Sequence, residues 1–268
     1  MTTPIALTIA GSDSGGGAGV QADLKAFSAL GAYGASVVTA LTAQNTRGVT
    51  AVEAASLPMI AAQIDAVLSD LDVKAVKIGM LAAAPVIETV AEGLSAYGGP
   101  IVLDPVMVAK SGDALLEDDA VSSLIRHLAP RASVLTPNLP EAARLLGAAE
   151  ASGADEMIAQ GEALLKLGPR AVLMKGGHAA GAECLDFLIS AEAPAIAFRS
   201  ERSPTKNTHG TGCTLSSAIA AGLAKGLDLV QAVGEAHAYL QGAIRAADEL
   251  EIGSGHGPVH HFHALWPS

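Results

Sequence analysis

Five segments of the sequence place glycines or single polar side chains directly after a short apolar run. They are IAGSDSGGGAG, KIGM, VLDPVM, VLTPNLPE and LMKGGH, which begin at residues 9, 77, 102, 134 and 173. Glycine lets backbone N–H groups approach a ligand closely, and a charged side chain beside apolar residues needs a cation, a donor or water. These segments are therefore the first candidates for a binding or catalytic site.

A second glycine cluster lies later in the chain, where Gly210, Thr211 and Gly212 precede a helical pattern rich in alanine and serine. The free N–H groups at a helix start and the positive end of the helix dipole form a site for an anion. Cys213 falls in the first turn, where the pKa of a thiol is expected below its usual value of about 8.5, so it is a candidate base or nucleophile. The alternative is a small buried side chain with no chemical role.

Two carboxylates and one ammonium group follow apolar runs elsewhere. Asp104 and Glu141 would be costly there without a cation or a donor. A shared Mg²⁺ ion would explain both, and a helix cap would explain either one. Lys175, followed by two glycines, is placed to contact a phosphate oxygen or to extend to solvent. An anion site, a cation, two carboxylates and a candidate base are together the groups that phosphoryl transfer requires.

The glycine-rich segment 11–25 fits neither of two common nucleotide-binding motifs. Gly17, Gly19 and Ala22 match GxGxxA, but that motif needs an acidic residue about 20 positions later for the ribose hydroxyl, and none occurs there. The P-loop pattern GxxxxGK[ST] is absent from the sequence. We interpret the segment as a substrate-facing loop, and the alternative is a flexible turn from strand to helix.

Short aliphatic runs alternate with longer segments of helical periodicity, which predicts an α/β protein. The predicted strands are Ile5–Ala10, Ser36–Leu41, Ala75–Ile78, Ile101–Leu103, Ser133–Leu135, Ala171–Met174, Leu185–Ile189 and Ala195–Phe198. The predicted helices are Leu57–Asp70, Val86–Leu94, Glu141–Leu146, Met157–Leu167, Thr214–Lys225 and Leu229–Ala247. This alternation indicates one domain over residues 1–268, with three αβα layers, a mostly parallel sheet and helices on both faces. Ligands bind such sheets at the carboxyl ends of the strands, so the candidate segments should converge on one site.

The composition argues against several classes of function. The 27 acidic and 16 basic residues give a formal net charge of −11, with no cluster of Lys and Arg interleaved with aromatics, so nucleic acid is not an expected partner. The longest apolar runs fall far below the ~18 residues that span a bilayer, so no membrane is expected either. No basic residue precedes the N-terminal apolar stretch, and the two cysteines fit neither a disulfide framework nor a metal site. We therefore expect a cytoplasmic protein with reduced thiols.

Four histidines lie near the C-terminus: His256, His260, His261 and His263. Their spacing matches no structural zinc pattern and no cysteine lies nearby, so we do not expect a zinc site. The sequence instead predicts a tail that docks onto the domain through His263, Leu265 and Trp266.

The motifs together resemble one family along nearly the whole chain. They are GSDSGGGAGVQADLK at 11–25, TALTAQNTRGV at 39–49, KIGML at 77–81, DPVMVAKSG at 104–112, TPNLPEA at 136–142, MKGGH at 174–178 and KNTHGTGCT at 206–214. On these motifs the chain resembles the hydroxymethylpyrimidine/phosphomethylpyrimidine kinases of thiamine biosynthesis, within the ribokinase-like family. Many sugar kinases of that family end the anion-site motif in Asp, as GxGD, whereas this sequence has Cys213 there, as the pyrimidine kinases do.

The resemblance implies a reaction and a set of partners. ATP would phosphorylate the hydroxymethyl group of 4-amino-5-hydroxymethyl-2-methylpyrimidine and then the monophosphate, with Mg²⁺ required and a homodimer expected. Gln44 would recognise the pyrimidine, because an amide offers both an acceptor and a donor. The alternatives are a pyridoxal or pyridoxine kinase of the same family and a binding protein without catalysis.

The resemblance also implies further site residues. Those lining the same pyrimidine pocket would be Asp23, Gly11, Met80, Val106 and Met107. Those acting on ATP would be Lys175, Asn138 and Thr211, with the N–H groups of residues 210–212 stabilising the transferred phosphoryl group. Cys213 would accept the hydroxyl proton, and Asp104 and Glu141 would face Mg²⁺.

Overall fold

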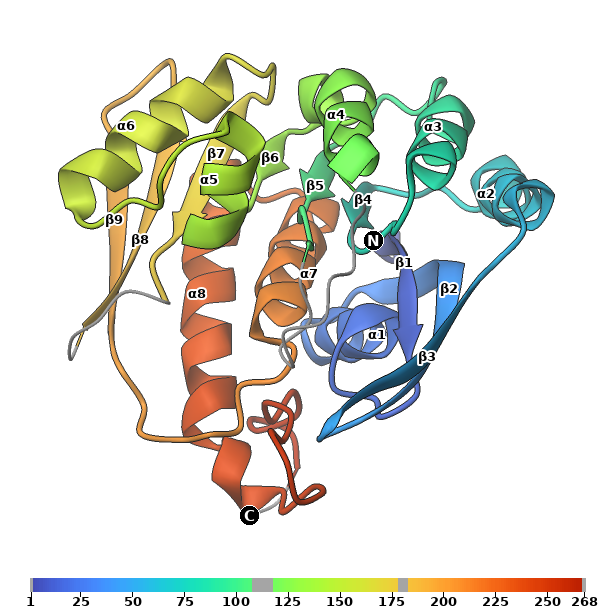
Figure 1. Ribbon diagram of the computed structural model, residues 1–268. Coiled ribbons are helices and arrows are strands. Elements are labelled where there is room, and N and C mark those ends of the chain that lie inside the picture. The colour runs from blue at the N-terminus through green and yellow to red at the C-terminus, as the bar shows by residue number, and fades with distance from the viewer. Residues whose placement is uncertain (1, 108–117, 178–182, 267–268) are drawn as a thin grey trace.

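Within the residues that the structure describes, 2–107, 118–177 and 183–266, the computed structural model contains one nine-stranded sheet (Figure 1). The strands are β1 (Ile5–Asp13), β2 (Tyr33–Asn45), β3 (Gly48–Ala54), β4 (Ala75–Ile78), β5 (Ile101–Leu103), β6 (Val134–Leu135), β7 (Ala171–Lys175), β8 (Glu183–Ser190) and β9 (Ile196–Glu201). Their order across the sheet is β3-β2-β1-β4-β5-β6-β7-β8-β9. All neighbours from β2 to β7 pair in parallel, and β3, β8 and β9 join antiparallel at the two ends.

Helices cover both faces of this sheet. They are α1 (Gly19–Ala29), α2 (Leu57–Asp70), α3 (Ala84–Gly93), α4 (Asp118–His127), α5 (Leu139–Leu146), α6 (Ala154–Leu165), α7 (Thr211–Ala224) and α8 (Leu229–Arg245), with short 3₁₀ turns at Ala129–Arg131 and Ala247–Glu249. One apolar core joins the sheet to α2 through α6, and a second joins the opposite face to α1, α7 and α8. The predicted three-layer α/β fold with a mostly parallel sheet is confirmed.

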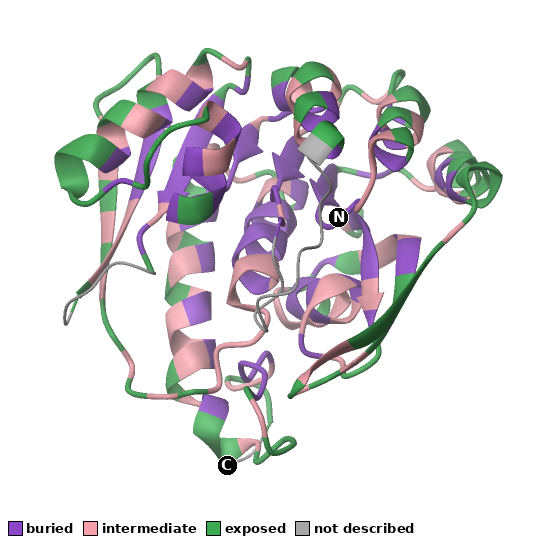
Figure 2. Cartoon of the chain, viewed as in Figure 1, coloured by how far each residue is buried: buried purple, intermediate pink, exposed green. Residues whose placement is uncertain are grey.

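The burial of the central strands explains why they could be predicted from the sequence. Every residue of β4 and β5 is buried (Figure 2), because helices cover the sheet on both sides. A strand buried on both faces has no polar side, so it reads as a continuous aliphatic run rather than an alternating one.

The structure corrects the predicted elements in three places. Strand β2 is longer than predicted, and β3, which pairs with its second half, was missed because most of its residues are exposed at the sheet edge. Helix α4 was also missed, although Ala120, Leu124 and Leu128 recur at helical spacing and are buried. Residues 108–112 and His178, which belong to two of the quoted motifs, lie outside the described residues.

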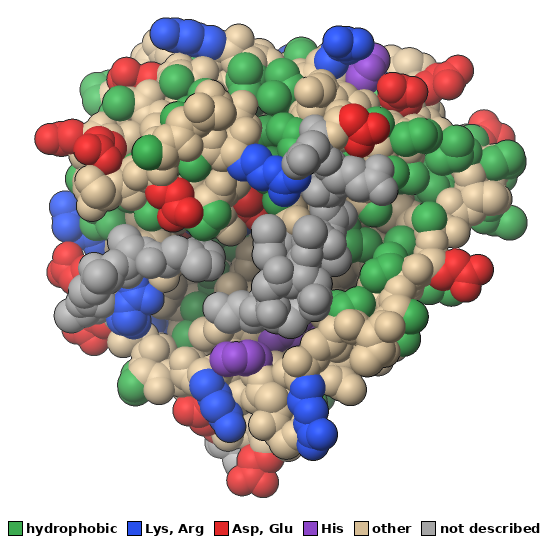
Figure 3. Space-filling model, viewed as in Figure 1, with side chains coloured by type: hydrophobic (Ala, Val, Ile, Leu, Met, Phe, Trp, Pro, Cys, Tyr) green, Lys and Arg blue, Asp and Glu red, His purple; other side chains and the backbone are tan. Residues whose placement is uncertain are grey.

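In the described part of the chain, no helix is long and apolar enough to cross a membrane. On the face shown in Figure 3, acidic and basic side chains are interspersed. The net charge of −11 is thus not gathered into a single acidic patch on this face.

Candidate active site

The predicted convergence of loops is confirmed. A cavity of about 860 Å³ lies at the carboxyl ends of the parallel strands and at the start of α7. It is lined by thirteen of the fourteen predicted site residues: Gly11, Gln44, Met80, Asp104, Val106, Met107, Asn138, Glu141, Lys175, Gly210, Thr211, Gly212 and Cys213. We refer to it below as the active-site cavity.

Lys175, at the end of β7, forms the centre of a charged cluster in this cavity. Its Nζ lies 2.9 Å from Asp104 Oδ1 and 4.0 Å from Glu141 Oε2. Burial opposes the charge of Lys175, but the two carboxylates outweigh it and raise the lysine pKa. Lys175 therefore stays cationic and does not extend to solvent, with a side chain only 13% exposed.

The two carboxylates differ in their ionisation. Burial opposes ionisation of Asp104, but the ammonium groups of Lys175 and Lys77 hold its pKa below the usual range. Burial raises the pKa of Glu141 to about 7, and the neighbouring Asp104 charge acts in the same direction. Glu141 also closes a capping box at the start of α5 with Asn138, so both predicted roles for this residue, a cap and a site carboxylate, fit its position.

The start of α7 faces Lys175. A Cβ atom placed on Gly212 would lie 3.4 Å from Lys175 Nζ and 3.7 Å from Asp104 Oδ2. Gly210 caps the helix with a φ of +80°, and a Cβ there would lie 1.8 Å from the Gly17 carbonyl oxygen. Only glycine fits that position, because the obstacle is backbone rather than a movable side chain. The N–H groups of the helix start and the lysine cation thus border the same space.

The structure contradicts the predicted pKa of Cys213. Burial raises it to about 11, and the Asp23 and Asp104 charges add to this effect, while Lys77 opposes it. The sequence showed the favourable helix start but not the desolvation or the two carboxylates around it. Cys213 is therefore a thiol at neutral pH.

Gln44, at the end of β2, lies on the cavity wall rather than in solvent. Its Oε1 is 3.1 Å from the Thr42 hydroxyl, but that single hydrogen has a shorter acceptor in the Ser12 carbonyl at 2.8 Å. Its Nε2 is 3.4 Å from His209 Nε2. His209 Nε2 is itself 2.8 Å from Asp13 Oδ2, and because a carboxylate only accepts, this ring nitrogen donates and has no lone pair for Gln44. Neither contact satisfies the amide of Gln44, so its donor and its acceptor are both available to a ligand.

Asp13 and His209 are cavity residues that the sequence did not single out. Beyond His209, the Asp13 carboxylate accepts hydrogen bonds from the N–H groups of Gly15, Gly17 and Ala18. It therefore fixes the glycine-rich loop against the segment that precedes α7. The two residues are 196 positions apart, so no sequence spacing indicates the pair.

Asp23 does not line the cavity, and its predicted place there is wrong. The side chain is fully buried beneath the cavity floor, where it pairs with Lys77 Nζ at 2.8 Å and accepts hydrogen bonds from Thr8 and Ser217. These partners satisfy both oxygens of the Asp23 carboxylate, so the side chain has no free oxygen for a substrate. The Asp23–Lys77 pair ties α1, β1, β4 and α7 together under the site.

Breaking this buried pair should destabilise the fold. Lys77→Met leaves Asp23 without a cation, and we expect a loss of about 3–5 kcal/mol in the free energy of unfolding, measured by urea titration. The double variant Lys77→Met/Asp23→Leu should recover part of that loss. Lys74→Met, which removes a partly exposed ion pair with Asp72, should cost less than about 1 kcal/mol. A similar small loss for Lys77→Met would show that the buried pair has no structural role.

The C-terminal tail docks in a different way from the prediction. His263 does pack on α8, with its ring 5.5 Å from that of Tyr239, but Leu265 and Trp266 are 62% and 55% exposed. The buried part is His260 and His261 instead. The described residues contain no group of three or more side chains suited to hold a metal, in the tail or elsewhere.

The three-layer αβα fold, with a buried lysine and a helix start at the carboxyl edge of its sheet, is that of a small-molecule kinase of the ribokinase-like class. The chain matches the phosphomethylpyrimidine kinase family over residues 13–260, and it belongs to that family, as its motifs predicted. It is 61% identical to the hydroxymethylpyrimidine/phosphomethylpyrimidine kinase of Rhizobium meliloti (strain 1021) over 98% of this chain and 99% of that relative.

Two solved structures extend the likeness to the fold. The ADP complex of Bacillus subtilis pyridoxal kinase has a TM-score of 0.91 at 35% identity, and the similarity covers 99% of this chain and 100% of that one. The phosphomethylpyrimidine kinase of Clostridium difficile 630 has a TM-score of 0.79 at 46% identity, over 90% of this chain and 99% of that one.

Proposed function

We propose that this kinase transfers the ATP γ-phosphate to 4-amino-5-hydroxymethyl-2-methylpyrimidine and then phosphorylates the monophosphate to the diphosphate. The observation that carries the proposal is one cavity with two sets of groups. It holds the available amide of Gln44, and it holds Lys175 beside the start of α7. Family membership and the hydroxymethylpyrimidine kinase relatives support the same substrate.

Each set of groups has a role in the proposed reaction. The amide of Gln44 pairs with the exocyclic amine and an adjacent ring nitrogen, which orients the hydroxymethyl group. Lys175 and the N–H groups of residues 210–212 stabilise the charge on the transferred phosphoryl group. Thr211 and Asn138 contact the ATP phosphates, and Cys213 accepts the proton of the attacking hydroxyl. Gly11, Met80, Val106 and Met107 form the walls of the pyrimidine pocket.

Mg²⁺ fits the donor set of the cavity. This ion is bound in kinases by one or two carboxylates together with substrate phosphates and water, so it does not need a cluster of three protein ligands. Asp104 and Glu141 both face the cavity, and within the described residues Asp104 Oδ2 has a hydroxyl neighbour, Ser216 Oγ at 3.2 Å, rather than a bonded cation. These two carboxylates would hold the ion, which neutralises phosphate charge when bound.

The test is direct detection of products. Purified protein is incubated with the hydroxymethylpyrimidine, ATP and Mg²⁺, and the mono- and diphosphates are measured by mass spectrometry. Both products are expected, and neither should form when Mg²⁺ is chelated. ATP consumption without a phosphorylated pyrimidine would reject the substrate assignment.

Pyridoxal is a second candidate substrate, because the fold is so similar to that of Bacillus subtilis pyridoxal kinase. Its ring also carries a hydroxymethyl group. Comparing kcat/KM for the pyrimidine and for pyridoxal under identical conditions separates the two. The pyrimidine should be preferred, since the family match and the 61% identical relative are both named for it.

Gln44→Ala should weaken capture of the pyrimidine without affecting ATP. Each buried partner left unpaired costs roughly 1–3 kcal/mol, so two losses raise the pyrimidine Kd by tens- to thousands-fold. Calorimetry with the pyrimidine, and separately with a non-hydrolysable ATP analogue and Mg²⁺, measures both affinities. Asn45→Ala, the exposed neighbour, is the control and should change neither affinity. A pyrimidine affinity within about twofold of the parent would exclude recognition by Gln44.

We also propose that the kinase is a cytoplasmic homodimer. Four large apolar side chains on β2, β3 and the first turn of α2 are 39–57% exposed, and they suit an interface with a second copy. They are Leu41, Val52, Leu57 and Met59. Met59→Glu should therefore reduce the mass in light scattering from a dimer to a monomer. The matched control is Val230→Glu on α8, where an exposed apolar residue stands apart from these four, and it should leave the dimer intact. A monomeric parent protein would reject the proposal.

A further inference from the structure

The C-terminal strap, which we define as residues 255–263, lies between α8 and the loop that precedes α7. Two hydrogen bonds attach it to α8. The His260 N–H donates to the Ala243 carbonyl at 2.9 Å, and the Tyr239 hydroxyl donates to the His261 carbonyl at 2.7 Å. The strap is therefore seated on a long helix and is not a free tail.

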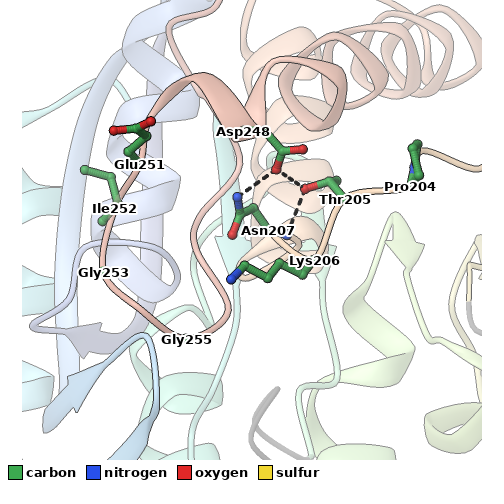
Figure 4. A pocket seen from close by; sticks show the side chains of 9 residues that line it. All are labelled: Pro204, Thr205, Lys206, Asn207, Asp248, Glu251, Ile252, Gly253 and Gly255. Carbon is green, nitrogen blue, oxygen red and sulfur yellow. Dashed lines mark hydrogen bonds between the residues drawn. The ribbon is translucent and has the colours of Figure 1, made fainter.

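The same strap holds the loop before α7. The Asn207 side chain accepts from the Gly257 N–H at 2.9 Å, and the His209 N–H donates to the Gly257 carbonyl at 3.1 Å. Beside this contact is a smaller hollow of about 550 Å³, where Asp248 accepts hydrogen bonds from Asn207 and Thr205 (Figure 4). Thr205, Asn207 and Asp248 in this hollow bind one another and so brace the loop that the strap holds.

One side chain of the strap reaches the anion site. His261 is 4% exposed, and its Nε2 lies 3.0 Å from the Thr214 hydroxyl in the first turn of α7. That hydroxyl lies 2.8 Å from the Gly210 carbonyl oxygen, which also accepts from the Thr214 N–H at 2.8 Å. The chain of contacts therefore runs from His261 through Thr214 to Gly210.

The number of hydrogens on each group decides which one donates in these hydrogen bonds. The Thr214 hydroxyl has one hydrogen, and it donates this hydrogen to the Gly210 carbonyl, which can only accept. His261 must then donate from Nε2 to the hydroxyl oxygen. Burial lowers the pKa of His261 to about 3, and the nearby Lys25 adds to this, so the ring stays neutral with its hydrogen on Nε2.

The Gly210 carbonyl and the Thr211 N–H belong to one planar peptide unit, so fixing the carbonyl also fixes the direction of the N–H. That N–H lies 3.4 Å from the Thr208 carbonyl, a long hydrogen bond that a phosphate oxygen can replace. We propose that His261 is a positioning residue that, through Thr214, orients the Gly210–Thr211 peptide toward the transferred phosphoryl group. This inference rests on the proposed phosphate site at the start of α7.

The kinetic test separates kcat from KM. His261→Ala should lower kcat about 10- to 100-fold, because losing one preorganised donor in a site of this kind costs about 10²- to 10³-fold and misorientation costs less. The KM for the pyrimidine should stay within twofold. Thr214→Val should give a similar loss, and the double variant should lose no more than either single one, since the residues act in series. If the loss of kcat in the double variant equals the product of the two single losses, the residues act independently and the proposal is overturned.

Rescue distinguishes positioning from general damage to the fold. His261→Gln keeps an N–H donor near the position of Nε2 and should recover most of the kcat. Added imidazole should restore part of the kcat of His261→Ala. His256→Ala is the matched control, because that ring is exposed and bonds only a Lys206 carbonyl among the described contacts. If His261→Ala does not fold, His261→Gln and Thr214→Val still test the proposed relay, by which we mean the contacts from His261 through Thr214 to Gly210. A loss of kcat in His261→Gln together with full activity in Thr214→Val would overturn this relay.

A binding measurement keeps this test independent of the acceptor substrate. Calorimetry with Mg²⁺ compares ADP with the non-hydrolysable triphosphate AMP-PCP. His261→Ala should lose affinity for AMP-PCP about tenfold and keep its affinity for ADP, because the oriented N–H faces the third phosphate. If the parent protein binds AMP-PCP but does not phosphorylate the pyrimidine, the substrate assignment fails while the relay stands. Equal losses for both nucleotides, or none, would overturn the relay itself.

Discussion

Lys175→Met is expected to lower kcat by about 10³-fold while the fold is retained. The ammonium group lies beside the start of α7 and borders the space where a phosphoryl group would be transferred. A fixed cation in that position typically contributes 10³- to 10⁵-fold, and its loss also leaves Asp104 and Glu141 without their shared partner. A 10³-fold loss corresponds to about 4 kcal/mol of transition-state stabilisation.

The measurement is single-turnover kinetics with saturating pyrimidine and Mg²⁺-ATP, so that binding and chemistry are separated. Circular dichroism and the urea midpoint report whether the variant is folded. Lys74→Met, a lysine outside the active-site cavity, should keep full activity. A folded Lys175→Met protein within tenfold of the parent kcat would remove Lys175 from the proposed catalytic residues.

The sequence predicts best what depends on local pattern. The parallel strands were found because burial on both faces makes them continuous aliphatic runs, and the loops after them were found because polar residues and glycines interrupt those runs. The same reasoning misses β3, since an exposed edge strand has no apolar run to mark it. Seven of the thirteen cavity residues were found from such patterns, and those that follow strands meet because parallel strands bring their carboxyl ends to the same edge. The other six were implied by the family resemblance: Gly11, Gln44, Met80, Val106, Met107 and Asn138.

Contacts between distant residues could not be predicted in this way. The family resemblance implied that Asp23 lines the cavity, and only the fold shows that Lys77, 54 positions later, bonds both of its oxygens. The Asp13–His209 pair is hidden for the same reason. The pKa of Cys213 shows the limit most clearly, because the helix start is visible in sequence while burial and two nearby carboxylates, which reverse the shift, are not.

Cys213→Ala is expected to lower kcat by 10²- to 10⁴-fold and to leave the ATP affinity unchanged, because general-base assistance acts on the transition state. The raised pKa adds a sharper expectation. Only the thiolate can accept a proton, and below a pKa of about 11 its fraction rises tenfold with each pH unit. The parent kcat/KM should therefore rise between pH 7 and pH 10, with a logarithmic slope approaching 1.

Two variants show whether the pH dependence of kcat/KM comes from Cys213. Cys213→Asp places a carboxylate at the position where many sugar kinases of this fold have one, and since Asp ionises near pH 4 its activity should be partial and flat across the same range. Cys184→Ala removes the other thiol and should preserve both the activity and the rise. If the parent profile is flat and Cys213→Ala stays within tenfold of it, the hydroxyl proton leaves by another route. The Cys213 thiol is then a small, partly buried side chain in the first turn of α7 with no chemical role.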